Sequence, residues 1–500
     1  MFLPLALAAL VVQTQVSRCS DVFTWRLPDT KIVGIESVSA AVALAQGPVH
    51  VAHCKVTGTI GTEIGFAVWL PEAWNGRFLM SGGGGFVGAL PAPGNGVDQG
   101  FAVATTDTGH QSSGTDAHWA LDNLERQLNF GYLATHRTAE TAKAIIRQYY
   151  GADPHHSYFN GCSTGGRQAL MEAQRFPNDF DGIVSGAPVY NWTQALAAAI
   201  KNVQATFPDP TAIQTPLVTV ENLKLVQQAT LDACDAKDGV RDMIIDDPRA
   251  CTFDLRRVNR CEGAAAADCL TDAQRAAIAR VYSPLRDANG LVYEGQPVGG
   301  EAEVGGWDVW VTGANQRTVA SSGVPNLSWG FGTQFFKYFV FADPNWSYRG
   351  YDVAANWYRD TRRVASFLDA DNPDLGAFRA RKGKLLLWHG WADPALNPLA
   401  TVRYYDRVVA RDPGAAEDVR LFMMPGVLHC AGGQGADQVD RLAAIVDWVE
   451  KGEAPTRLVA SKRVGADVVR TRPLCMYPQA AIYKGSGSTD DAANFTCRAR

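Results

Sequence analysis

A serine in a glycine-bounded turn is the residue of this sequence best suited to nucleophilic chemistry. Gly161-Cys162-Ser163-Thr164-Gly165 fits the pattern G-x-S-x-G. The apolar run before it predicts a strand, and the amphipathic run after it predicts a helix. Small residues on both sides allow the sharp turn that exposes the serine hydroxyl at the start of such a helix. This context favours Ser163 as a nucleophile over a chance match to a short pattern.

A serine hydroxyl is a weak nucleophile and needs a base, which in turn needs an orienting carboxylate. Residues 384–388 form a buried apolar run that leads to Asp393, and residues 419–424 form another that leads to His429. The chain order Ser, Asp, His is that of α/β-hydrolases. We therefore predict Asp393 as the orienting acid and His429 as the general base, with His389 beside the acid as the rival base.

Acyl transfer also needs backbone N–H donors directed at the charge that develops on the ester oxygen. Thr164, the residue after the nucleophile, is predicted to supply one donor. A run of four glycines, Gly82 to Gly85, follows an early predicted strand and has the position expected of the second donor. No G-K-[ST] sequence follows the run, which excludes a phosphate-binding loop.

The elements that must position these residues read as alternating strands and helices. Expected strands cover residues 66–70, 77–80, 100–105, 157–159, 182–185, 384–388 and 419–424, and expected helices cover residues 134–150, 168–176 and 438–451. This rhythm predicts an α/β-hydrolase fold, with a parallel sheet covered by helices. The rhythm stops within residues 191–370, which we interpret as a large inserted lid domain.

Length and composition bound the other possibilities. A chain of 500 residues is too long for one ordinary core. Its net charge of −5 and the lack of a basic block exclude a nucleic-acid partner.

Residues 1–12 form an apolar run that is too short to span a bilayer. The run is similar to the core of a secretory signal, although no Lys or Arg precedes it. The alternative is a buried first element of the fold. We predict a signal peptide over residues 1–18, a catalytic domain over 19–190 and 371–500, and no stable membrane insertion.

Ten cysteines behind a signal-like start indicate five disulfides in an oxidising compartment. We therefore expect a secreted or periplasmic protein. Zinc is the competing use of cysteine, but the sequence has no C-x-x-C pair and no Cys and His cluster at zinc-finger spacing.

The catalytic residues together resemble one known family. Cys162-Ser163, Asp393 and His429-Cys430 match the "CS–D–HC" arrangement of the tannase and feruloyl esterase family. Similar segments extend over nearly the whole chain: Trp74 to Arg77, Phe176 to Pro188, Asp343 to Trp346, and the tail from Arg472 to Gly487. The resemblance implies a serine esterase, and it implies Gly85 as the second oxyanion donor. The family also includes esterases that cleave mono(2-hydroxyethyl) terephthalate.

The resemblance further implies how the cysteines pair. The cysteines that flank the family's serine and histidine are linked, which gives Cys162–Cys430 here. The other implied pairs are Cys19–Cys54, Cys234–Cys251, Cys261–Cys269 and Cys475–Cys497.

An acidic loop in the insertion predicts a structural calcium ion. Asp235, Asp238 and Asp242 repel one another unless a cation lies between them, and calcium prefers oxygen ligands, backbone carbonyls included. The loop resembles the calcium site of the family's lid, which adds the carbonyls of Val240 and Ile244 to the ligands. The alternative is a solvated acidic turn.

The substrate is expected to be a small aromatic ester, because aromatic residues are dense at residues 307–346 of the insertion. Most of them are expected in the lid's own core. Trp310 matches a substrate-facing Trp of the terephthalate-monoester enzymes, Leu396 is placed to line the same slot, and Arg317 lies in a run similar to one that binds the substrate carboxylate. The stretch from Trp329 to Trp346 instead resembles feruloyl esterases and tannases, so we favour a feruloyl or galloyl ester over the terephthalate monoester.

Two other classes of protein remain as alternatives. Peptidases of the same fold share the Ser, Asp, His order but carry other caps. A catalytically inactive binding protein is disfavoured because all three triad residues are present.

Overall fold

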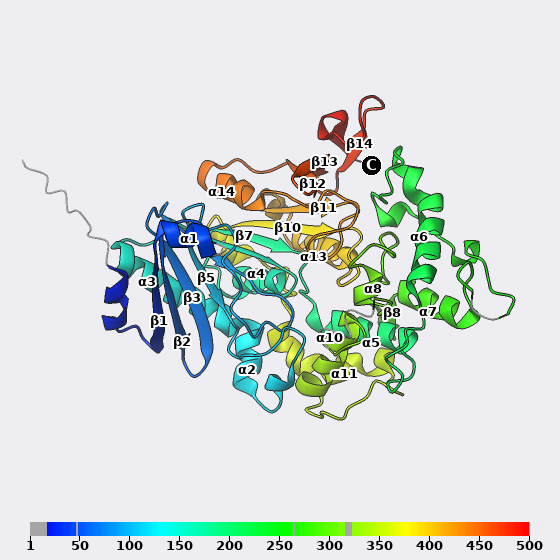
Figure 1. Cartoon of the computed structure of the whole chain (residues 1–500), viewed down its shortest axis with the longest axis horizontal. Coiled ribbons are helices and arrows are strands. Elements are labelled where there is room, and N and C mark those ends of the chain that lie inside the picture. Colours follow the sequence, from blue (N-terminus) through cyan, green and yellow to red (C-terminus); the bar gives the residue numbers. More distant parts are fainter. Residues whose placement is uncertain (1–17, 47–48, 264–265, 316–322, 500) are drawn as a thin grey trace, which may run out of the picture.

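The structure, a computed structural model, describes residues 18–46, 49–263, 266–315 and 323–499. Its centre is a nine-stranded sheet (Figure 1). In spatial order the strands are β1 (Thr30–Val38), β2 (His53–Ile60), β3 (Ile64–Pro71), β5 (Ala102–Thr106), β4 (Arg77–Ser81), β6 (His156–Cys162), β7 (Gly182–Gly186), β10 (Lys384–Gly390) and β11 (Val419–Met424).

The sheet is mixed rather than wholly parallel, which corrects the sequence prediction. Strands from β5 to β11 pair in parallel, whereas β1, β2, β3 and β5 pair antiparallel. β2 and β3 are joined by a short turn at Gly61, whose φ is +58°, and a tight turn of this kind forces antiparallel pairing. The predicted α/β arrangement itself is confirmed.

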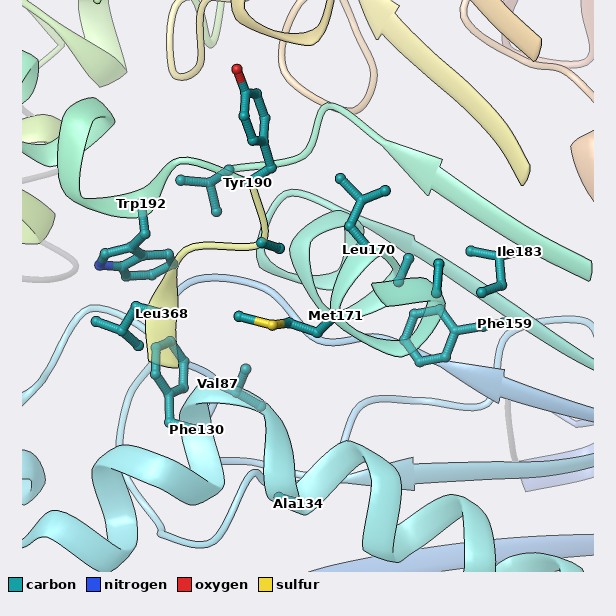
Figure 2. Packing of buried hydrophobic residues seen from close by; sticks show 14 of the residues in the cluster. Val87, Phe130, Ala134, Phe159, Leu170, Met171, Ile183, Tyr190, Trp192 and Leu368 are labelled. Carbon is teal, nitrogen blue, oxygen red and sulfur yellow. The ribbon is translucent and has the colours of Figure 1, made fainter. Parts of the chain in front are cut away.

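Alternation along each central strand divides the core into two layers. Leu385 and Leu387 of β10 pack on the side of α3 (Ala134–Tyr150), α4 (Thr164–Arg175) and α13 (Pro398–Arg411). Leu386 and Trp388 pack on the opposite side, with α14 (Arg441–Lys451). Because both faces are covered, these strands are continuous apolar runs, as in parallel sheets generally. Figure 2 shows Leu170 and Met171 of α4 packed with Phe159 and Ile183 of the sheet. Leu368, at the end of the later helix α11 (Val353–Leu368), belongs to the same cluster.

Between β7 and β10, the described residues add no strand to the central sheet. They form α5 (Trp192–Thr206), α6 (Val220–Cys234), α7 (Asp272–Tyr282), α8 (Trp307–Trp310), α10 (Leu327–Phe335) and α11 (Val353–Leu368), with a hairpin of β8 (Leu285–Asp287) and β9 (Gly290–Tyr293). These helices lie together beyond one end of the sheet (Figure 1). A separate cluster that includes Leu223, Ile278 and Trp307 forms its own small core.

The remaining elements are peripheral. They are α1 (Ala40–Gln46), α2 (Leu124–Leu128), α12 (Gly376–Ala380), and two C-terminal hairpins made of β12 (Arg457–Val464) with β13 (Asp467–Cys475) and β14 (Ala480–Tyr483) with β15 (Phe495–Arg498). Of the helices in the described ranges, none combines the length and apolarity needed to cross a membrane.

Five disulfides cross-link the chain, four of them between nearby segments and one, Cys162–Cys430, across a sequence separation of 268 residues. They join Cys19 to Cys54, Cys162 to Cys430, Cys234 to Cys251, Cys261 to Cys269, and Cys475 to Cys497. These are the pairs that the family resemblance implies.

Candidate active site

Ser163 stands in a strained turn between β6 and α4. Its φ of 63° and ψ of −124° lie in a region that non-glycine residues rarely adopt. The turn is so tight that a Cβ added to Gly161 would lie 2.5 Å from the backbone of Gly165. The glycines of the motif are therefore required by close approach, and the turn presents Ser163 at the N-terminus of α4 as the sequence predicts.

Asp393 and His429 follow the C-terminal ends of the adjacent strands β10 and β11. His429 Nδ1 lies 2.7 Å from Asp393 Oδ2. This bond leaves the other ring nitrogen of His429 for a substrate or nucleophile, and Ser163 and His429 line the same pocket. The structure thus brings together the three residues that the sequence nominates as nucleophile, acid and base.

The carboxylate of Asp393 is completely buried and bonded on both oxygens. Oδ1 accepts the backbone N–H groups of Ala395 and Leu396 at 2.8 and 3.0 Å, and His389 Nε2 lies 3.0 Å from Oδ2. Burial by itself raises the pKa of a carboxyl group, but the His429 charge and the hydrogen bonds from His389 and His429 hold the pKa of Asp393 well below its ordinary value. Asp393 is therefore ionised at neutral pH.

The glycine run predicted to form the oxyanion site packs directly on the nucleophile turn. The Thr164 hydroxyl donates to the Gly85 carbonyl at 2.6 Å, and the Gly83 N–H donates to Gln168 of α4 at 3.1 Å. Gly85 has a φ of +56°, and a Cβ there would lie 2.3 Å from the Gly114 carbonyl. These contacts hold the backbone of Gly85 and Thr164 beside Ser163, where N–H donors can stabilise a tetrahedral intermediate.

The Cys162–Cys430 disulfide joins the residue before Ser163 to the residue after His429. The two Cα atoms are 6.0 Å apart across a sequence separation of 268 residues. The bond therefore restrains the distance between the nucleophile loop and the base loop, which no local sequence element could do.

A pocket that opens to solvent contains these groups. Its walls are mainly apolar and come from both the insertion and the sheet edge: Val189, Trp192, Leu196, Trp310, Phe331 and Leu396. Among the residues that the structure describes, the lining holds no Lys, Arg, Asp or Glu. Ser328 is a polar group on the insertion side. The pocket suits a flat, uncharged acyl group beside Ser163.

The residues predicted to contact substrate differ in their placement. The ring of Trp310 lies 4.9 Å from that of His429, nearly perpendicular to it, and stacks on Phe331 at 6.0 Å. Leu396 also lines the pocket, whereas Arg317 falls outside the described residues. Phe331, one of the aromatic residues at 307–346, lines the pocket as well, and Trp192 lines it but was missed. The position of Trp192 soon after the end of β7 is the one signal in the sequence that could have indicated it.

The other aromatic residues of the insertion do not all gather in a core of its own, which corrects the expectation. Phe335, Phe336 and Phe339 belong to the main core cluster, where Phe339 packs against Phe86 and Phe130 of the catalytic domain. All three are completely buried, whereas Trp307 belongs to the separate insertion core.

The acidic loop predicted to bind calcium begins where α6 ends. Asp235 Oδ1 accepts the N–H groups of Asp242 and Met243, and Asp238 Oδ1 accepts that of Val240. Burial raises the pKa of Asp242, Arg472 and Arg470 oppose the rise, and Asp235 adds to it. Arg472 of β13 also donates to Asp242.

The donor chemistry of this loop fits a hard cation, since the side-chain donors are carboxylates that destabilise one another. The carboxylate oxygens of these three side chains do not all lie within 4.8 Å of one another. The loop is therefore more open than a preformed metal site. A bound ion would draw Asp235, Asp238 and Asp242 together, with the carbonyls of Val240 and Ile244 as the further ligands named from the sequence.

A second group of potential ligands lies between α3 and α4. The ligand atoms of His136, Glu172 and Asp179 all lie within 4.8 Å of one another. His136 Nδ1 is 2.6 Å from Asp179, and the Lys143 ammonium donates to the Asp179 carbonyl. Burial and the neighbouring Asp179 raise the pKa of Glu172 well above its ordinary value. Two basic side chains thus already face these acids, which makes a metal ion unnecessary here.

Comparison with known proteins gives one consistent result. The family described as "Tannase and feruloyl esterase" matches residues 49–498. An uncharacterised esterase of Xanthomonas campestris is 37% identical, with 98% of this chain and 93% of the relative covered. Mono(2-hydroxyethyl) terephthalate hydrolase of Piscinibacter sakaiensis is 35% identical, with 92% and 87% covered. The crystal structure of feruloyl esterase B from Aspergillus oryzae superposes with a TM-score of 0.84 at 26% identity, covering 96% of this chain and 99% of that one.

Proposed function

We propose, from the premise that this chain belongs to the tannase and feruloyl esterase family and is a carboxylic ester hydrolase, that it cleaves esters of uncharged aromatic acids through a serine acyl-enzyme. One observation carries the proposal: Ser163, His429 and the buried Asp393 meet at a pocket whose walls are aromatic and aliphatic and hold no charged side chain among the described residues.

The proposed reaction has two steps. Ser163 Oγ attacks the ester carbonyl while His429 takes the hydroxyl proton, and the N–H groups of Gly85 and Thr164 bind the oxyanion. His429 then gives the proton to the departing alcohol as the carbon–oxygen bond breaks. Water attacks the acyl-enzyme by the same route, which releases the acid and restores Ser163. Asp393 stays ionised and holds the tautomer of His429.

The acyl group is proposed to be of the feruloyl or galloyl type. Its ring would lie between Trp310, Phe331 and Trp192, and Ser328 offers a hydrogen bond to a ring substituent. Hydrolysis of mono(2-hydroxyethyl) terephthalate is the alternative, supported by the relative of that name at 35% identity. That substrate carries a carboxylate, which is costly to bury without a cation, and the described residues that line the pocket include no Lys or Arg. Arg317, predicted to bind that carboxylate, lies outside the described residues.

A matched pair of substrates tests this point. Mono(2-hydroxyethyl) terephthalate and 2-hydroxyethyl 4-methylbenzoate share the alcohol and the ring and differ in the para substituent, which is a charged carboxylate in the first and a neutral methyl group in the second. We expect kcat/KM at least about tenfold higher for the neutral ester, and methyl ferulate or methyl gallate to exceed methyl acetate. A preference for the charged ester would establish the alternative, and no turnover of any ester would favour an inactive binding protein.

Calcium and secretion belong to the same proposal. A structural calcium ion held by the 235–244 loop would neutralise Asp235, Asp238 and Asp242. The five disulfides support an oxidising compartment, hence a secreted or periplasmic enzyme. The predicted signal peptide lies almost wholly outside the described residues.

A further inference from the structure

His389, the rival base of the sequence analysis, contacts the same carboxylate oxygen of Asp393 as the base His429. His389 is completely buried at the end of β10. Its Nε2 is 3.0 Å from Asp393 Oδ2 and 3.1 Å from the Leu396 carbonyl oxygen. Two acceptors face this nitrogen, so it must carry a proton.

The other ring nitrogen fixes this tautomer. His389 Nδ1 lies 2.7 Å from the hydroxyl of Thr401, which is completely buried on α13. The hydroxyl can donate to Nδ1 when the ring is neutral. Since Asp393 Oδ2 also accepts from His429, a continuous line of hydrogen bonds runs from Thr401 through His389 and Asp393 to His429.

We propose that His389 is a positioning residue for ester hydrolysis, which shares Asp393 Oδ2 with His429 and thereby sets the direction and strength of the hydrogen bond that Asp393 accepts from the base. This inference rests on the proposed serine mechanism. His389 touches neither substrate nor nucleophile, and it acts only through Asp393.

Few other ionisable groups surround this pair. His429 comes from the loop after β11, and Tyr293 of β9 accepts the N–H of Asn397 near Asp393. The ion pair of Arg403 on α13 with Glu294 spans 3.0 Å. The charges that act most on Asp393 are those of His429 and His389, so a change at His389 should act directly on Asp393.

The test compares two substitutions that cannot titrate. His389→Gln keeps an N–H donor for Asp393, and His389→Leu removes it. We expect His389→Leu to lower kcat about 10- to 100-fold with KM nearly unchanged, because a hydrogen bond to a charged group is lost while the pocket is intact. His389→Gln should recover most of that loss.

The pH dependence separates positioning from a merely structural role. Without the hydrogen bond from His389, the carboxylate of Asp393 attracts the protonated form of His429 more strongly. The acidic limb of the kcat/KM profile should therefore move to higher pH in His389→Leu. In His389→Gln it should return toward its wild-type position. His53→Leu is the matched control, since His53 is a buried histidine on β2 that bonds a backbone carbonyl. It should leave kcat and the acidic limb unchanged.

The outcomes are decisive in each case. Wild-type kcat and an unmoved acidic limb in folded His389→Leu would overturn the proposal, as would equal losses in the Leu and Gln variants. If His389→Leu does not fold, Thr401→Val takes its place and should give a smaller loss of kcat; no loss would overturn the role. Retained hydrolysis in Ser163→Ala would overturn both the serine mechanism and the role of His389. If Ser163→Ala is inactive but His389→Leu is fully active, only the role of His389 is overturned.

Discussion

At the scale of single residues, the turn at Ser163 stores strain where a reactive hydroxyl must be exposed. The left-handed backbone of Ser163 is maintained by glycine contacts on both sides and by the N–H bond of Ser163 to the Gly186 carbonyl at 3.0 Å. The side chain itself contributes little to this geometry. Removing the hydroxyl should therefore change chemistry and leave the fold unaltered.

Ser163→Ala is expected to lower kcat by about 10⁴-fold or more, because the acyl-enzyme cannot form. Its melting temperature should match that of the wild type. Ser157→Ala, at the start of the same strand β6, is the control and should keep full activity. A covalent serine-directed inhibitor should label the control but not Ser163→Ala. Substantial turnover by Ser163→Ala would refute the assignment.

Trp310 is the aromatic residue of the pocket that contacts both the base and a second ring. Trp310→Ala should reduce kcat/KM for methyl ferulate about tenfold, since stacking and buried area are lost, and should change kcat/KM for methyl acetate much less. Trp310→Phe keeps a ring and should lose less. Parallel losses on both esters would show that Trp310 supports the fold rather than the acyl group.

The sequence predicted these residues unevenly for a physical reason. Ser163, Asp393 and His429 each follow an apolar strand, and the ends of parallel strands must meet at one edge of the sheet. The bond of His389 to Asp393 and the pocket positions of Trp192 and Phe331 depend on side-chain directions and on the docking of the insertion, which no spacing encodes.

At the scale of elements, the spacing of apolar residues predicted helices with one buried face and strands with both faces buried. The helix predicted over residues 134–150 and the strand predicted over 419–424 have these bounds in the structure. β1 was not predicted, because Lys31, Glu36 and their polar neighbours leave it half exposed at the sheet edge. The helices of the insertion were not predicted, although α5, α6 and α11 have 15, 15 and 16 residues. α5 is buried over most of its length, so it lacks the polar face that makes a helical period visible in a sequence.

The helix α14 is tied to the sheet by one carboxylate. Glu450 accepts two hydrogen bonds from Arg77 of β4, at 2.7 and 2.6 Å, and one from the Tyr158 hydroxyl of β6 at 2.7 Å. The Arg77 hydrogen bonds, more than any other cause, lower the pKa of Glu450 to about 2. The folded state therefore favours the ionised form.

This depressed pKa makes the stabilisation depend on pH. It is fully present above the ordinary carboxyl pKa of 4.5 and is lost as the pH falls toward about 2. Glu450→Gln should therefore lower the melting temperature at pH 7, for a loss of about 1–2 kcal/mol, and the difference from wild type should shrink by pH 3. Glu453→Gln, nearby on the exposed surface, is the control. A difference that is independent of pH would contradict the ionic origin.

At the scale of the whole molecule, the acidic loop links the insertion to the C-terminal hairpins. Arg472 of β13 donates to Asp242, and Arg470 lies beside the Asp242 carbonyl. A calcium ion in this loop would therefore stabilise two parts of the chain that are far apart in sequence.

Removal of calcium is expected to lower the melting temperature by several degrees, because an ion bound only to the folded state stabilises it. Activity on a small ester at 25 °C should fall much less, since the loop lies outside the residues that line the pocket. Asp235→Asn should be less stable and no longer respond to chelator or to added calcium. An identical melting curve before and after complete chelation would exclude a structural ion.

The assembly of the pocket was beyond the reach of sequence reasoning. Its two walls, Trp310 with Phe331 and Leu396 with Val189, come from segments that only the folded molecule brings together. The family resemblance supplied the disulfide pairs and the proposed calcium ligands, whereas the composition of the insertion indicated only that aromatic residues would be available.

The Cys162–Cys430 bond has a topological consequence. It closes a covalent ring in the chain, and this ring contains the whole insertion together with Asp393. A single proteolytic cut within the ring opens it without separating the pieces, so nucleophile and base stay tethered. A nicked enzyme should run as one band on a non-reducing gel and as two after reduction, and protease resistance of activity should disappear with that one bond.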